Sequence, residues 1–181
     1  MGASFGMVAL RGFALSKDSN AYFTHGVASG DPLKDRVILW TRVIPGDGFD
    51  RGLDVEWQVA ADKGFAEVTS SGHFFTDASR DFTVKLDASS LEPGRQYFYR
   101  FLSEGVVSPT GVTRTLPVGE VARFRIGIAS CSNYPQGFFN AYRDMASQDL
   151  DAVVHLGDYI YEYPDGGYAN KEALERLNRH V

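Results

Sequence analysis

The chain has 181 residues, of which 44% are hydrophobic and 23% charged, and this composition excludes a disordered or fibrous protein. Its net charge of −5 makes a nucleic acid or an anionic membrane surface an unfavourable partner. The single cysteine excludes an intrachain disulfide framework, and these residues contain no apolar run long enough for a transmembrane span.

Residues 1–22 are predicted to be a leader. The segment is apolar and rich in small residues, and Ala14-Leu15-Ser16 resembles a signal-peptidase site. Arg11 interrupts the apolar run, and no basic stretch precedes it. We interpret the segment as the remnant of an export signal. A loosely ordered leader or a short buried strand is the alternative.

Residues 23–117 show the pattern of a β-sandwich, in which short stretches of alternating polar and apolar residues are separated by turns. Strands are expected at residues 36–44, 54–60, 82–86 and 96–101. In the last of these, Tyr97, Tyr99 and Phe101 share one face. The spacing predicts an antiparallel sandwich of the fibronectin III or immunoglobulin kind.

The turn before the last of these strands has a recognisable composition. From Leu91 to Tyr97 the chain resembles the corner of fibronectin type III domains, where a tyrosine hydroxyl forms a hydrogen bond to the backbone. His25 and His73 stand alone in this half of the chain. They are interpreted as surface or turn residues and not as ligands.

After residue 117 the pattern changes to that of an α/β fold. A strand at 124–129, a helix at 136–147 and a strand at 151–156 predict one βαβ unit, and a second helix is expected at 171–180. The apolar run at 151–156 is typical of a strand buried on both faces. One such unit by itself cannot cover both faces of its sheet, so it would expose Ile126, Ile128, Val153 and Val154.

The ends of these two strands carry the candidate site. Parallel strands end at the same edge of a sheet, which places Cys131 and Asp158 opposite each other, with Tyr161 three residues on. A thiolate, a carboxylate and a phenolate suit ferric iron, and a carboxylate can bridge two metals. The alternatives are a small buried cysteine, a packing tyrosine and, for His155, a hydrogen-bonded core histidine.

These residues resemble a known family. The segment from Gly157 to Tyr161 is similar to the signature Gly-Asp-x-x-(Asp/Tyr) of binuclear metallophosphoesterases. Cys131 stands where most of these enzymes have an aspartate, and this favours PhoD-like alkaline phosphatases over purple acid phosphatases. Residues 23–32 and 37–42 resemble the opening of the N-terminal domain of PhoD-like enzymes.

The resemblance implies a metal-dependent alkaline phosphatase or phosphodiesterase that contains Fe(3+) and Ca(2+). Cys131 and Tyr161 match the iron-binding positions, and Asp158 matches the carboxylate that bridges the metals. The substrate implied is a phosphate ester or a phosphodiester, with no specific nucleic-acid-binding module. The family also implies a secreted, periplasmic or cell-surface protein, exported by the twin-arginine route.

The resemblance covers the first third of such an enzyme, so residues 123–181 are predicted to be the start of its catalytic domain. Later signatures of the family supply an asparagine and further aspartate and histidine ligands, and no segment after Tyr163 matches them. The chain alone is therefore expected to be inactive. The alternative is a stand-alone β-sandwich binding module with a non-catalytic α/β appendage.

Overall fold

The computed structural model describes residues 21–46, 51–133 and 139–161. The chain divides into two compact units, and the boundary falls between Gly119 and Glu120. Ala21 and Tyr22, which the prediction assigned to the leader, form a short strand, while residues 1–20 lie outside the described part. No helix within the described ranges has the length and apolar character needed to cross a membrane.

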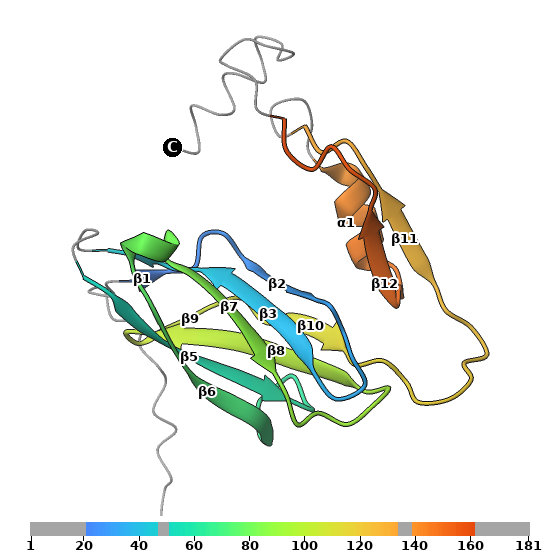
Figure 1. The fold of residues 1–181 in the computed structure, drawn as a ribbon, viewed down its shortest axis with the longest axis horizontal. Coiled ribbons are helices and arrows are strands. Elements are labelled where there is room, and N and C mark those ends of the chain that lie inside the picture. Colours follow the sequence, from blue (N-terminus) through green and yellow to red (C-terminus); the bar gives the residue numbers. More distant parts are fainter. Residues whose placement is uncertain (1–20, 47–50, 134–138, 162–181) are drawn as a thin grey trace, which may run out of the picture. The chain divides into compact units, whose positions relative to one another are not determined.

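The first unit is built from two antiparallel β-sheets (Figure 1). The smaller sheet has the order β2-β3-β7, and its strands are β2 (Val27–Gly30), β3 (Val37–Arg42) and β7 (Thr83–Ala88). The larger sheet has the order β10-β8-β5-β6, with β9 paired to β8; its strands are β5 (Leu53–Ala60), β6 (Val68–Thr76), β8 (Gln96–Ser103), β9 (Val106–Val107) and β10 (Gly111–Arg114). A separate pair joins β1 (Ala21–Tyr22) to β4 (Ile44–Pro45).

Alternate side chains of both sheets form one hydrophobic core. The face predicted from the sequence on β8 is confirmed, because Tyr97, Tyr99 and Phe101 are all buried. On β3 and β5, Leu39 and Val55 are fully buried, as the period of two requires for strands with one face on a core. The strand expected at 36–44 is divided into β3 and β4, and the described unit has β6 as an additional long strand.

The corner before β8 contains the hydrogen bond that its composition suggests. The backbone N–H of Glu92 donates to the hydroxyl of Tyr97 over 2.8 Å. Thr115 completes the corner, because its hydroxyl donates to the carbonyl of Glu92 at 2.6 Å and accepts from the N–H of Arg95 at 3.1 Å. Gly94 has a φ of 68°, a left-handed conformation that glycine adopts without steric cost. The turn is thus held by side chains from two separate segments.

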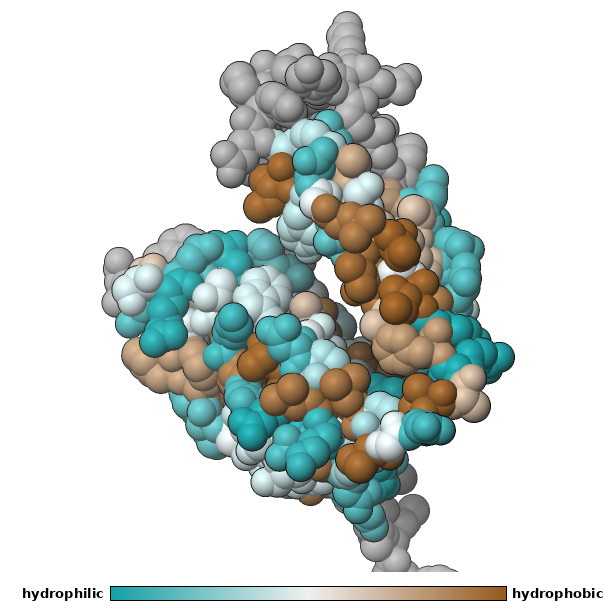
Figure 2. Space-filling view, turned by 45° about the vertical axis from the view of Figure 1, so that its right-hand side comes forward, coloured by the Kyte–Doolittle hydropathy of each residue, from teal (hydrophilic) through white to brown (hydrophobic). Residues whose placement is uncertain are grey.

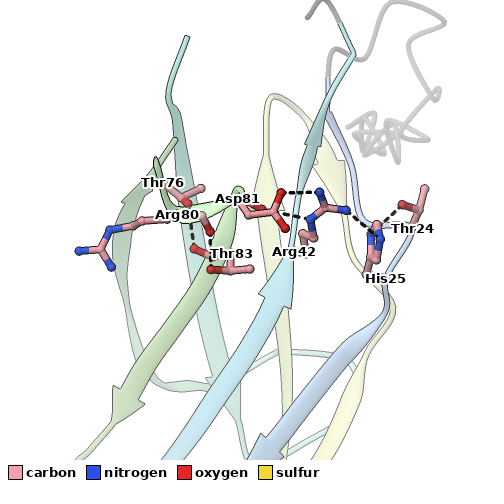
Figure 3. A network of polar contacts seen from close by, with 7 residues as sticks. All are labelled: Thr24, His25, Arg42, Thr76, Arg80, Asp81 and Thr83. Atoms are coloured by element: carbon pink, nitrogen blue, oxygen red, sulfur yellow. Dashed lines mark hydrogen bonds and ion pairs between the residues drawn. The ribbon is translucent and has the colours of Figure 1, made fainter. Parts of the chain in front are cut away.

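The two histidines of this unit are exposed and paired, as predicted for surface or turn residues. Figure 3 shows Arg42 between His25 and Asp81, the residue that follows the short 3-10 helix η1 (Ala78–Arg80). The Arg42 guanidinium lies 2.9 Å from His25 Nε2 and 2.6 Å from Asp81 Oδ1. On the larger sheet, His73 Nδ1 lies 2.6 Å from Asp54 Oδ2. Both histidines therefore have polar partners at the surface.

The second unit contains two parallel strands connected through a helix (Figure 1). They are β11 (Ile126–Ala129) and β12 (Ala152–His155), and between them in the chain lies α1 (Asn140–Ser147). Gly127 allows close packing here, because a Cβ at this position would lie 2.8 Å from Leu150 Cδ1. The start of the helix predicted at 136–147 and all of the one predicted at 171–180 lie outside the described residues.

The apolar side chains of these strands are largely exposed (Figure 2). The expectation that β12 is buried on both faces is wrong for this structure, since Val153 is 54% exposed and Val154 43% exposed. The other expectation, that Ile126, Ile128, Val153 and Val154 would be exposed, is confirmed, since each of these side chains is at least 43% exposed. The physical reason is that one helix can cover only one side of a two-stranded sheet.

Candidate metal centre

The ends of β11 and β12 run side by side beyond the strands themselves. The N–H of Leu156 donates to the carbonyl of Ala129 at 2.8 Å. The N–H of Cys131 then donates to the carbonyl of Gly157 at 3.1 Å, and that of Ser132 to the carbonyl of Asp158 at 2.9 Å. The parallel pairing therefore continues into both loops, which holds the two candidate ligand segments next to each other.

Both candidate ligands at the strand ends have a left-handed backbone. Cys131 has a φ of 62° and Asp158 a φ of 52°, after a Gly157 with a φ of 129°. For residues with a Cβ this conformation costs roughly 1–2 kcal/mol each. Strained positions of this kind persist where surrounding contacts hold them, and they concentrate at functional sites. Here the backbone hydrogen bonds between the two loops supply those contacts.

The three predicted ligand side chains meet at one carboxylate oxygen. The thiol of Cys131 lies 3.5 Å from Asp158 Oδ2, and the hydroxyl of Tyr161 lies 3.0 Å from the same atom. Cys131 and Asp158 are exposed and Tyr161 is half-buried. The alternative of a buried, hydrophobic Cys131 is therefore wrong, and the structure brings all three predicted residues together.

The phenol of Tyr161 keeps its proton in this arrangement. Its pKa is raised above the ordinary range, first by a hydrogen bond to Cys131, then by removal from water, and then by the hydrogen bond to Asp158. The thiol and the phenol both act as donors toward the one carboxylate. A cation placed among the three groups would replace these protons with its own positive charge.

The donor set fits a hard, highly charged cation. Phenolate and carboxylate oxygens are ligands of ferric iron, and thiolate sulfur is a further iron ligand. Within the described ranges, no three His, Cys, Asp or Glu side chains come together as a metal site, so the phenol of Tyr161 is the group that completes a set of three. Its place three residues after Asp158 is the signal that sequence reasoning used.

A second polar cluster lies directly beside these ligands. The hydroxyl of Ser132 lies 2.8 Å from His155 Nε2 and also contacts the hydroxyl of Tyr142 on α1. The expectation that His155 is hydrogen-bonded is confirmed, but the residue is half-buried rather than in a core. Sequence reasoning missed Ser132 and Tyr142. The position of Ser132 next to Cys131 was the available signal, whereas Tyr142 lies within the helix predicted at 136–147 and carries no signal of its own.

An aromatic hollow of about 690 Å³ borders this cluster. It is lined by Ser132, Phe139, Tyr142, Val153, His155 and Tyr159. The ring of Tyr159 meets the ring of His155 edge to face, with the centroids 4.9 Å apart. The strand ends thus combine an exposed polar edge with an apolar surface beside it.

Two regions of the sequence match families of known proteins. Residues 10–117 match the N-terminal domain of PhoD-like phosphatases, and residues 126–180 match the PhoD-like phosphatase domain that follows it. The chain belongs to the PhoD-like phosphatase family. This assignment favours the PhoD-like interpretation over the purple acid phosphatase alternative.

Individual relatives agree with the PhoD-like assignment. Alkaline phosphatase D of Bacillus subtilis (strain 168) is 43% identical over 163 residues, which are 86% of this chain and 28% of the relative. A solved structure described as that of PhoD is 41% identical and superposes with a TM-score of 0.79, covering 87% of this chain and 31% of the other. The chain thus spans less than a third of the length of both.

Proposed function

We propose that this chain is the N-terminal part of a metal-dependent phosphoric ester hydrolase of the alkaline phosphatase D type. The observation that carries the proposal is the meeting of Cys131 and Tyr161 at one oxygen of Asp158. Family membership supports the reaction class, since the relative from Bacillus subtilis is an alkaline phosphatase. The substrate proposed is therefore a phosphate monoester or diester.

The proposed roles follow from the chemistry of each side chain. Cys131 and Tyr161 would hold Fe(3+) through sulfur and phenolate oxygen, while the carboxylate of Asp158 would be shared with Ca(2+). When bound, the metals supply Lewis acidity toward phosphate oxygens and lower the pKa of an attacking water. The contribution of this chain is to hold the three donors together and to release the protons of the thiol and phenol.

The domain assignment and localisation are part of the same proposal. Residues 23–117 would form a sandwich domain of the fibronectin III or immunoglobulin kind, and residues 123–181 the first part of the catalytic domain. Residues 1–20 would be the remnant of an export signal of a secreted, periplasmic or cell-surface protein, since Ala21 and Tyr22 form β1. The separation into units at Gly119 supports the domain assignment.

Titration of the purified chain with ferric iron tests the proposed metal site. Binding through a phenolate produces a charge-transfer band in the visible, and we expect this band in the wild-type chain and its loss in Tyr161→Phe. Tyr159→Phe is the matched control, because it removes a phenol oxygen from an exposed tyrosine two residues before Tyr161. A band that survives Tyr161→Phe would contradict the proposed ligand set.

The alternative function makes the opposite prediction in the same titration. A sandwich binding module with a non-catalytic appendage has no use for an iron ligand set, so its wild-type chain would show no band. We also expect no hydrolysis of an aryl phosphate by the 181-residue chain, because three ligands do not complete a binuclear site. Metal-dependent hydrolysis by this chain would overturn that expectation.

A further inference from the structure

The hydroxyl of Ser132 joins three elements of the second unit through hydrogen bonds. Ser132 lies in the segment after β11, His155 ends β12, and Tyr142 lies on α1. His155 Nε2 lies 2.8 Å from Ser132 Oγ and 3.0 Å from the hydroxyl of Tyr142, and the two hydroxyls also contact each other. We call these three residues the Ser132 network.

The other ring nitrogen of His155 decides the direction of these hydrogen bonds. The backbone N–H of Gly157 donates to Nδ1 over 3.4 Å, so Nδ1 carries the lone pair. In the neutral ring the proton is then on Nε2, which donates toward Ser132 and Tyr142. A histidine in this tautomer cannot accept a proton from Ser132, so the pair is not a nucleophile with its base. The network therefore acts as an anchor.

The anchor acts on the metal-ligand segment itself. Ser132 follows Cys131 directly, and its N–H donates to the carbonyl of Asp158 at 2.9 Å. The backbone of Ser132 is thus hydrogen-bonded to the segment that contains Asp158, while its side chain is hydrogen-bonded to β12 and α1. Cys131, with its φ of 62°, needs such contacts to remain in this left-handed conformation, which is strained for a residue with a Cβ.

We propose that Ser132, Tyr142 and His155 are positioning residues that hold Cys131 next to Asp158 in the geometry required for binding the metal. The inference rests on the proposed function, because it takes these two residues as ligands. None of the three network residues belongs to the proposed ligand set. They would act as the outer shell that orients metal ligands, whose loss typically lowers metal affinity about 10- to 100-fold.

Amide hydrogen exchange of the metal-free, full 181-residue chain is the first test. We expect Ser132→Ala and Tyr142→Phe to accelerate exchange of the Cys131 and Ser132 amides by about 2- to 10-fold, as expected for the loss of one hydrogen bond. Ser132→Thr keeps the hydroxyl and should restore the wild-type rate. Ser147→Ala is the matched control, because among the described residues its hydroxyl donates only to the carbonyl of Asp144 within the same helix.

Iron affinity of the same variants is the second test. If the wild-type chain shows the iron–phenolate band, Ser132→Ala and Tyr142→Phe should weaken iron binding at least about 10-fold, and Ser147→Ala should leave it unchanged. Accelerated exchange with unchanged affinity would overturn the positioning role, as would unchanged exchange in both variants. A wild-type chain without the band overturns the proposed function instead, and the exchange rates alone then decide whether the network anchors Cys131.

Discussion

Removal of the Tyr97 hydroxyl should destabilise the first unit substantially. The ring is 0% exposed, and its hydroxyl accepts the N–H of Glu92 at 2.8 Å. Tyr97→Phe keeps the packing of the ring but leaves this backbone N–H without its partner in a half-buried corner. Such a loss costs about 1–3 kcal/mol, so we expect a decrease of about 2 kcal/mol in the free energy of unfolding. For a unit of about 100 residues this lowers Tm by roughly 8–16 °C.

Urea unfolding followed by tryptophan fluorescence measures this effect in the first unit alone. The chain has two tryptophans, Trp40 on β3 and Trp57 on β5, and both strands belong to this unit. Tyr22→Phe is the matched control, because the side chain of Tyr22 is exposed and its variant should change stability by less than about 0.5 kcal/mol. A loss of under 0.5 kcal/mol in Tyr97→Phe as well would refute the argument that this hydrogen bond holds the corner.

Two further predictions concern the same unit. Leu39→Ala should reduce the free energy of unfolding by about 2–5 kcal/mol, because Leu39 is fully buried. Leu33→Ala, at an exposed site, is the control. Equal decreases in the free energy of unfolding in the two variants would contradict the assignment of Leu39 to the core. The carboxylate of Asp62 accepts the N–H groups of Ala66 and Glu67, and these bonds lower its pKa. A carboxyl group whose pKa is lowered by folding stabilises the folded state at pH values above its pKa in the unfolded chain. Asp62→Asn should therefore destabilise the chain at pH 7. The difference should shrink below about pH 4, as the wild-type carboxylate takes up its proton, and urea midpoints at several pH values measure this.

Strands with one buried face were predictable from the sequence because their side chains alternate. Tyr97, Tyr99 and Phe101 show the period of two, and the structure places all three in the core. The longest strand, β6, was missed because its side chains are mainly exposed or half-buried and include several small or polar residues. Its existence depends on pairing with β5 along its whole length, from Leu53 opposite Thr76 onward. The partner strand is the preceding one in the chain, but β6 itself lacks the regular alternation of apolar side chains by which the other strands were recognised.

The candidate ligands were predictable for a different reason. Cys131 and Asp158 follow two apolar runs, and the rule that parallel strands end at one edge brings them together without knowledge of distances. The contact of Tyr161 with the carboxylate agrees with the spacing of the family signature. Sequence reasoning could not predict that Tyr142 on α1 would reach Ser132, because this depends on how the helix packs on the sheet.

The sequence by itself therefore determined the period of the main strands, the two-part organisation and the identity of the three candidate ligands. These properties follow from local side-chain patterns and from the position of each residue along its own strand. Only the tertiary structure decided the left-handed conformation of Cys131 and Asp158, the shared carboxylate oxygen and the Ser132 network. These features depend on separate elements being held within hydrogen-bond distance. Cys131 and Asp158 are 27 residues apart, and Ser132 and His155 are 23 residues apart.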